Sequence, residues 1–195
     1  MLKRCFILIP PILGLFYAAP VRAGGVNKDF DIIQITPMVG VEIDKVMSFS
    51  MGGSNGTTPN FNMGSATSVA YGALAGVKLG PINLGALLQR STGIGSSRGL
   101  TLDKIYGEFG VIGGVSIFTA ALHLDGGLVT MTNPDHSQFH GYGAKLGFAM
   151  DIYPIKWFSV GVGADADLQF FMAPGNLHFI GVMGGTIVLR TGVHI

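Results

Sequence analysis

The chain has 195 residues, of which 48% are hydrophobic and only 12% charged, with a formal net charge of +1. Soluble domains carry about 25% charged residues, so this composition is too poor in charge to cover a water-exposed surface. The sequence also has no apolar run of about 18 residues, which disfavours a membrane-spanning helix.

The N-terminal segment has the pattern of a secretory signal peptide. Two basic residues precede an apolar core at 6–19, and residues 21–23 form a small-x-small cleavage site. We expect cleavage after Ala23, which leaves a single mature domain, 24–195. An uncleaved membrane anchor is the alternative, but the apolar core is short and contains two prolines. Cys5, the only cysteine, would be removed with the signal peptide, so no disulfide is available to the mature protein.

The mature charge balance excludes one class of partner. Three of the twelve basic residues lie in the first 23 positions, so nine basic residues remain against eleven acidic ones, a formal charge of −2. No basic cluster survives in the mature sequence. Binding to nucleic acid, which needs clustered Lys and Arg against phosphates, is therefore not expected.

Alternating hydrophobic and polar residues dominate the rest of the sequence. In "FSVGVGADADLQFF" (158–171), every second residue is apolar, and up to Gln169 the residues between are Ser, Gly, Asp and Gln. This period of two indicates a β-strand with two different faces. Eight such segments are predicted, at 31–43, 65–79, 82–90, 100–113, 115–128, 139–153, 158–171 and 177–195.

The connections between these strands alternate in length. Those at 44–64, 91–99, 129–138 and 172–176 are long or moderate, and those at 80–81, 113–114 and 154–157 are short. Bacterial outer-membrane barrels have short periplasmic turns and longer external loops. The pattern predicts an all-β fold, an eight-stranded antiparallel up-and-down transmembrane β-barrel.

Three other folds would explain parts of the pattern. A soluble lipocalin-like barrel would need a charged exterior, whereas the polar face here is mostly Gly, Ser, Ala and Thr. A four-helix membrane protein would have to use segments that are short, rich in glycine and β-branched. A ten-stranded barrel would need two more hairpins than the sequence contains.

The signal peptide, the hairpin pattern "GYGAKLGFAMDIYPIKWFSVGVGADADLQF" (141–170) and the alternating last strand together resemble the small eight-stranded bacterial outer-membrane β-barrel proteins. The resemblance covers 24–195 and implies a location in the outer membrane of a Gram-negative bacterium. It implies outer-membrane lipids, lipopolysaccharide, periplasmic chaperones and the barrel assembly machinery as partners. In this group the last strand usually ends in an aromatic residue that the insertion machinery reads, whereas this chain ends in Ile195.

The inward face of such a barrel would hold most of the ionisable residues. Counting across the 154–157 turn sets Lys145 opposite Asp165 or Asp167, and counting across 113–114 sets Lys104 opposite His123. Charges in a narrow lumen are costly unless paired, so we expect a structural ion network that plugs it. Its predicted members are Lys104, Glu108, His123, Asp125, Lys145, Asp165 and Asp167.

Aromatic residues near the 154–157 turn are the candidate membrane-interface anchors. Tyr153, Trp157 and Phe158 cluster there, and amphipathic rings favour the boundary between lipid and water.

The function expected from these features is that of a non-enzymatic, monomeric barrel that displays surface loops, above all 44–64, for structural or interaction roles. A porin-like conduit for small apolar solutes is the alternative. A lipid-modifying enzyme is a weaker one, because His136 and Ser137 of "NPDHSQFH" would point to opposite sides of an extended strand. His136 and His140 are also poorly spaced for a metal pair, so we expect neither a cofactor nor a metal.

Overall fold

A computed structural model of the protein describes residues 33–50, 60–115, 117–172 and 178–195. The predicted signal peptide and its cleavage site after Ala23 lie outside the described residues. The helical part of the described ranges is too short and too polar to cross a membrane.

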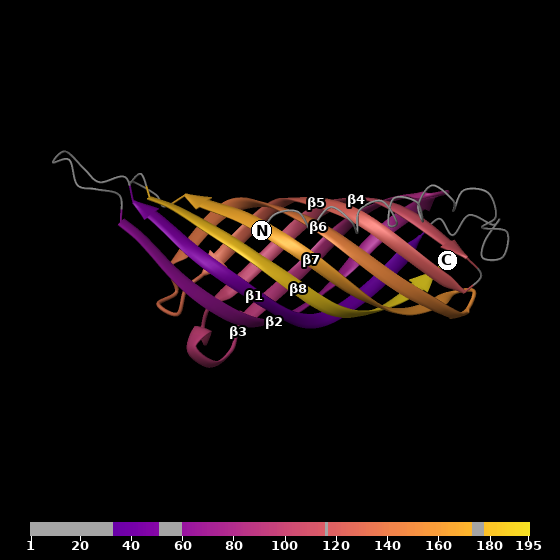
Figure 1. Ribbon diagram of the computed structural model, residues 1–195, viewed down its shortest axis with the longest axis horizontal. Helices are drawn as coiled ribbons and strands as arrows, with labels where there is room; N and C mark the ends of the chain where they lie inside the picture. Colours follow the sequence, from indigo (N-terminus) through magenta and orange to yellow (C-terminus); the bar gives the residue numbers. More distant parts are fainter. Residues whose placement is uncertain (1–32, 51–59, 116, 173–177) are drawn as a thin grey trace, which may run out of the picture.

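Eight antiparallel strands form a closed barrel in which each strand pairs with its neighbours in sequence and β1 pairs with β8 (Figure 1). This confirms the predicted eight-stranded up-and-down barrel. The strands are β1 (Gln34–Ser50), β2 (Asn60–Leu79), β3 (Ile82–Gly93), β4 (Thr101–Val115), β5 (Phe118–Thr132), β6 (Gln138–Ile155), β7 (Phe158–Met172) and β8 (His178–His194).

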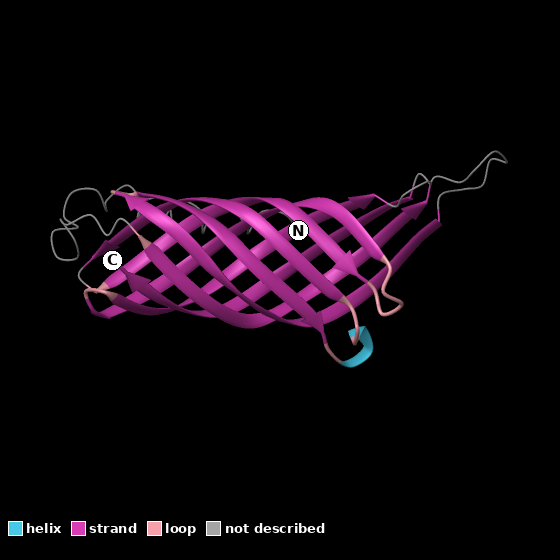
Figure 2. Ribbon diagram, turned by 180° about the vertical axis from the view of Figure 1, so that it is seen from behind, coloured by secondary structure: helices cyan, strands magenta, loops and turns pink. Residues whose placement is uncertain are grey.

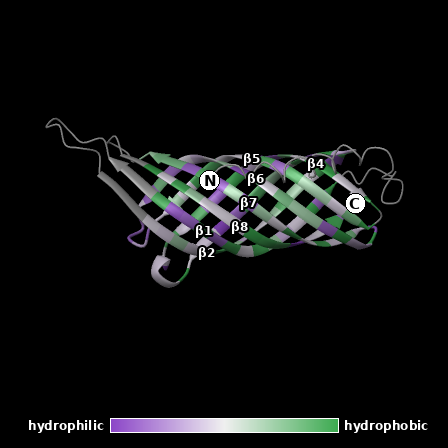
Figure 3. Ribbon diagram, viewed as in Figure 1, coloured by the Kyte–Doolittle hydropathy of each residue, from purple (hydrophilic) through white to green (hydrophobic). Residues whose placement is uncertain are grey.

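The strands place apolar side chains outside and polar side chains inside. On β1, Glu42 and Asp44 are fully buried in the barrel, whereas Val41 and Ile43 are about half exposed on its outer wall. Buried and exposed residues alternate in the same way along the other strands, and Figure 3 shows hydrophilic and hydrophobic residues interleaved along the ribbons. A soluble barrel would have the opposite arrangement, so this wall is built to contact an apolar solvent such as lipid.

The barrel has two unlike ends. At the turn end, β2 and β3 are joined by Gly80 and Pro81, and Gly80 takes a positive φ of 64° that favours glycine. At the loop end, β3 and β4 are joined by residues 94–100, which include a single 3-10 turn (Gly95–Ser97, Figure 2). Residues 133–137 join β5 to β6 at the same end. The expected alternation of long and short connections is therefore present.

Two predicted connections are wrong. The segment 44–64 was predicted to be one long loop, but β1 continues to Ser50 and β2 begins at Asn60, and residues 51–59 lie outside the described ones. The turn between β4 and β5 was predicted at 113–114, but β4 continues to Val115 and β5 begins at Phe118. The first error shortens β1 and β2, and the second places the β4–β5 turn too early in the chain.

Candidate functional site

The seven residues predicted to form the lumen network all point into the barrel. Lys104, Asp125 and Lys145 are almost completely buried, and the side chain of Asp165 is only 5% exposed. The alternation of β4 to β7 positions them, because every second side chain of these strands faces inward. They lie in two groups, one near the middle of the barrel and one closer to the turn end.

The middle group centres on Lys104. Its Nζ donates hydrogen bonds to Glu42 Oε1 at 2.5 Å and to Asp167 Oδ2 at 2.9 Å, and all three side chains are inaccessible to solvent. Glu42 also accepts hydrogen bonds from the hydroxyl of Ser91 and from Gln89 Nε2. Four strands, β1, β3, β4 and β7, are thus joined across the lumen through one lysine and one glutamate.

The predicted partner of Lys104 was wrong. Because the β4–β5 turn lies further along the chain, the residue paired with Lys104 in the ladder is Val129, and His123 pairs with Gly110. Lys104 therefore reaches across the lumen to partners on β1 and β7. The sequence had predicted a partner on the neighbouring strand, β5.

The second group centres on His123. Its Nδ1 lies 3.1 Å from Asp125 Oδ1 and its Nε2 lies 3.3 Å from Asp165 Oδ1. Lys145 Nζ approaches the other oxygen of Asp165 at 3.3 Å and donates to Gln89 Oε1 at 2.7 Å, which links the two groups. Glu108 Oε2 completes the group, 4.0 Å from His123 Nδ1.

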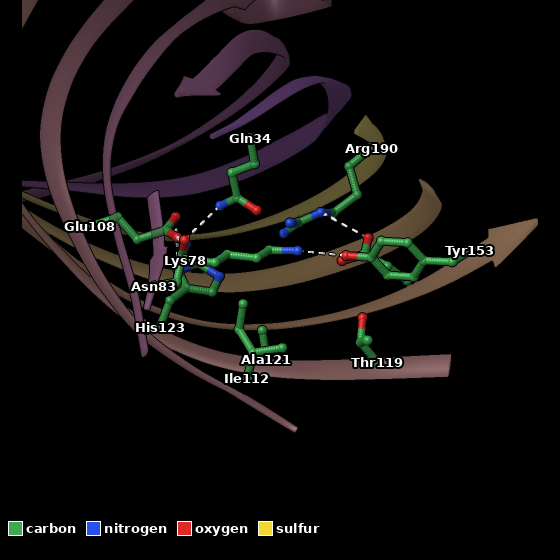
Figure 4. A pocket seen from close by; sticks show the side chains of 12 residues that line it. Gln34, Lys78, Asn83, Glu108, Ile112, Thr119, Ala121, His123, Tyr153 and Arg190 are labelled. Atoms are coloured by element: carbon green, nitrogen blue, oxygen red, sulfur yellow. Dashed lines mark hydrogen bonds and ion pairs between the residues drawn. The ribbon is translucent and has the colours of Figure 1, made fainter. Parts of the chain in front are cut away.

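A small polar cavity, with room for about one water molecule, lies at the turn end (Figure 4). Lys78 donates from Nζ to the hydroxyl of Tyr153 at 2.7 Å, and Arg190 Nε lies 3.1 Å from Asp151 Oδ1. Glu108 and His123 line the opposite side of the same cavity. The second group of the lumen network is thus connected to this cavity.

Tyr153 is a correction to the predicted interface anchors. It is only 4% exposed and its ring points into the lumen, because it continues the alternation of β6, in which Asp151 is buried and Ile152 is exposed. Trp157 is 59% exposed at that turn, and its ring meets the half-buried Phe158 edge-on with 6.3 Å between centroids. The anchoring roles of Trp157 and Phe158 stay predictions.

Glu42 and Asp44 are lumen residues that sequence reasoning missed. The predicted first strand ended at Ile43, so Asp44 was assigned to the 44–64 loop and the alternation beyond it was not followed. Asp44 is completely buried, and neither of its carboxylate oxygens has a hydrogen-bond partner among the described residues. The signal was present, because Glu42 and Asp44 lie two positions apart and alternate with the exposed residues Val41 and Ile43.

An apolar cluster fills the lumen toward the loop end, where a polar lumen had been expected. It contains aromatic and aliphatic side chains from six strands, with partly buried neighbours such as Phe139 packed against it. Its buried members are Leu74, Leu87, Leu102, Tyr106, Val129, Met131, Phe171 and Val182. The lumen therefore changes from apolar at the loop end to ionic in the middle.

The 133–140 segment, considered above as an enzymatic site, has a different local organisation. Asp135 Oδ1 accepts hydrogen bonds from the hydroxyl of Ser137 at 2.6 Å and from its backbone N–H at 3.0 Å, and these bonds lower the pKa of Asp135. His140 Nδ1 lies 3.1 Å from the Thr130 hydroxyl. Within the described residues, no hydrogen bond joins Ser137 to either His136 or His140, so the segment has the geometry of a loop held by an Asx-type turn.

No protein-family model and no curated protein sequence matches this chain. The structure is similar to the crystal structure of Neisserial surface protein A (NspA), with a TM-score of 0.58 and 13% identity over 82% of this chain and 97% of that one. It also matches the outer-membrane protease OmpT from Escherichia coli (TM-score 0.46, 8% identity, 88% and 99% of the two chains). A third match is Ail, the attachment invasion locus protein of Yersinia pestis, with a TM-score of 0.28 and 10% identity over 78% of this chain and 97% of that one.

At these identities the likeness concerns the fold, and the NspA match carries it. The chain therefore has the fold of the small eight-stranded outer-membrane β-barrel proteins.

Proposed function

We propose that this chain is a non-enzymatic, monomeric barrel of the Gram-negative outer membrane, with a lumen closed to diffusion and with loops that form its working surface. The observation that carries the proposal is the bridge from Lys104 to Glu42 and Asp167, which crosses the lumen between β4, β1 and β7. An eight-stranded barrel leaves an interior just wide enough for side chains to fill. The buried charges at this level support a lumen that is closed to solutes.

The exterior supports the proposed location. Large apolar side chains stand about half exposed over the whole barrel wall, for example Val39, Leu88, Ile105 and Leu146. A wall of this kind needs lipid around it, and in bacteria closed β-barrels of this size cross the outer membrane. Delivery there would use the predicted signal peptide, periplasmic chaperones and the barrel assembly machinery. N-terminal sequencing of the mature protein, expected to begin at Gly24, tests the first step.

The loop end supplies the proposed contact surface. Arg90 lies on the outer wall three residues before the end of β3 and forms a two-pronged ion pair with Asp103 at 2.6 and 2.9 Å. Arg98 is exposed in the adjoining loop. Exposed cations at this height would lie beside the phosphates of outer-leaflet lipopolysaccharide, so we include lipopolysaccharide among the partners.

A conduit for small apolar solutes is the second candidate. The apolar cluster around Phe171 and Leu102 favours it, because such a lining would accept an apolar solute from the loop end. The ionic middle of the lumen opposes it, since a solute would have to pass Lys104 and its buried partners. The two candidate functions therefore differ in whether a solute can pass Lys104 and its partners in the middle of the lumen.

Planar-bilayer conductance and uptake of radiolabelled toluene into barrel-containing vesicles would decide between the candidates. The closed barrel should show neither steady current nor toluene flux above empty vesicles. A triple variant, Glu42→Ser, Lys104→Ser and Asp167→Ser, removes the bridge and should raise the current. Arg90→Ser, a charge removal on the outer wall, is the matched control and should not. Saturable toluene flux through the unmodified barrel would instead establish the conduit.

A further inference from the structure

Glu108, His123 and Asp125 bring three metal-ligating side chains together inside the barrel. One ligand atom from each lies within 4.8 Å of the other two. Glu108 comes from β4 and the other two from β5, and Glu108 is the direct ladder partner of Asp125. The group is therefore fixed by neighbouring positions of one antiparallel pair, with no dependence on a loop.

Neighbouring residues orient two of these side chains, and His123 Nδ1 also contacts the third, with 3.1 Å to Asp125 Oδ1. Asn83 Nδ2 donates to Glu108 Oε1 at 2.5 Å, and the other oxygen, Oε2, faces His123 Nδ1 at 4.0 Å. On the far side of the ring, His123 Nε2 lies 3.3 Å from Asp165 Oδ1. A metal ion would take the place of the proton between His123 Nδ1 and the two carboxylates, and the ring proton would then lie on Nε2 and be donated to Asp165. A carboxylate behind the histidine and a hydrogen bond behind the acid are typical of metal sites.

Asp125 gives a second, independent indication of a missing ligand. It is 99% buried, and its Oδ2 has no hydrogen-bond partner among the described residues. A buried carboxylate oxygen without a partner is costly, and a cation would satisfy it.

The lumen as a whole also has an excess of acidic groups. Of the described residues, seven carboxylates but only four lysine or arginine side chains face it: Glu42, Asp44, Glu108, Asp125, Asp151, Asp165 and Asp167 against Lys78, Lys104, Lys145 and Arg190. Lys145, which lies beside the His123 group, is engaged by Asp165. A divalent cation would offset the charge of Glu108 and Asp125.

We propose that Glu108, His123 and Asp125 bind a divalent transition-metal cation of the Zn²⁺ type that stabilises the barrel. One imidazole nitrogen with two carboxylates is a donor set suited to Zn²⁺ and its neighbours, and less suited to Mg²⁺ or Ca²⁺, which prefer oxygen ligands alone. The small polar cavity at the turn end is lined by Glu108 and His123, so it has room for about one water molecule as a further ligand (Figure 4). Asp165 acts here as a positioning residue.

Titration calorimetry of the purified, EDTA-treated barrel with ZnCl₂ tests the proposal. We expect one equivalent of Zn²⁺ to bind and the urea midpoint of unfolding to rise with Zn²⁺ concentration. Glu108→Gln and His123→Asn should each weaken binding by at least about tenfold, and Asp165→Asn by about 10–100-fold. MgCl₂ at the same concentrations should change neither the heat nor the urea midpoint.

Two matched controls separate this site from other groups. Asp151→Asn removes a carboxylate from the same cavity that is not part of the cluster, so its Zn²⁺ affinity should equal that of the unmodified barrel. The double change His136→Ala with His140→Ala removes the loop histidines and should also leave affinity unchanged.

Cobalt gives a readout that does not depend on stability. Co²⁺ bound through the imidazole and carboxylates should produce a visible absorption band that is lost in His123→Asn, while heat-modifiable gel migration shows that the variant is folded. If His123→Asn does not fold, the isosteric Glu108→Gln variant provides the comparison. The proposal is overturned if the folded barrel takes up no Zn²⁺, or if uptake survives Glu108→Gln and is lost with the loop histidines.

Discussion

Lys104 on β4 and Glu42 on β1 meet across the lumen with 2.5 Å between Nζ and Oε1, although 62 residues separate them in the sequence. Neither strand neighbours the other, so this ion pair ties together opposite parts of the wall. A buried pair of this kind contributes little net stability compared with an apolar packing, yet removing one partner leaves an unpaired buried charge. The bridge is thus a sensitive point of the barrel.

Replacing Lys104 with Met should destabilise the barrel by about 3–5 kcal/mol, because both Glu42 and Asp167 then lose their cation. Lys145→Met should cost less, since Asp165 would keep its contact with His123. Lys45→Met, on the exposed face of β1, is the control and should change stability little. Urea unfolding in detergent, followed by circular dichroism, gives the three values. Equal midpoints for Lys104→Met and Lys45→Met would contradict the bridge.

Adding Glu42→Gln to Lys104→Met should recover part of the lost stability. The double variant no longer buries a glutamate charge opposite an uncharged side chain. Lys104→Met alone leaves Glu42 without its cation, whereas Glu42→Gln alone leaves Lys104 paired with Asp167. The double-mutant cycle on the same urea curves should give a coupling free energy of about 1–3 kcal/mol. Strictly additive effects would mean that the two side chains do not interact in the folded barrel.

Asp44 and Asp167 should respond in opposite ways to the same isosteric change. Asp44 is completely buried and neither oxygen has a described partner, so Asp44→Asn removes an unsatisfied buried carboxylate and should raise the urea midpoint. Asp167→Asn takes one carboxylate away from Lys104 and should lower it. Since both changes preserve shape, the comparison isolates charge. A lowered midpoint for Asp44→Asn would show that this carboxylate has a stabilising partner.

Gly147 on β6 makes room for the His123 group. A Cβ at this position would overlap Asp165 Oδ1 and the His123 ring, so Gly147→Ala must displace both and should cost about 1–3 kcal/mol. Gly126→Ala is the matched control, because a Cβ there faces outward and its nearest atom lies at 3.8 Å. Thermal unfolding monitored at 218 nm would compare them. Tolerance of Gly147→Ala equal to that of Gly126→Ala would mean that His123 and Asp165 can move apart freely.

The sequence alone was sufficient to predict the eight strands and the side of the barrel wall to which most side chains point. A period of two assigns each residue to one face, so the inward placement of Lys104, His123 and Asp165 followed without knowledge of register. The low content of charged residues then predicted that the outer face contacts lipid. Both inferences depend only on local order along one strand.

Partners in the lumen could not be read in the same way. The run "GVIGGVSIF" (110–118) has glycines where a turn was expected at 113–114, yet the ladder continues to the pairing of Val115 with Phe118. That shift exchanges His123 for Val129 opposite Lys104. Contacts between strands that are not neighbours, as from Lys104 to Glu42, also depend on how the closed barrel is sheared, and a hairpin count contains no information on that.

Trp157 offers a direct measurement of membrane depth, because it is the only tryptophan in the sequence. It lies beside the β6–β7 turn, is 59% exposed, and packs edge-on against Phe158, so its indole should sit among the headgroups at the turn end. In vesicles, its fluorescence should be quenched strongly by a lipid brominated near the headgroup and weakly by one brominated at the chain end. A Trp157→Phe variant, which should fold normally, supplies the background. Stronger quenching from the bilayer centre would place the turn within the hydrocarbon core and rule out the interface position.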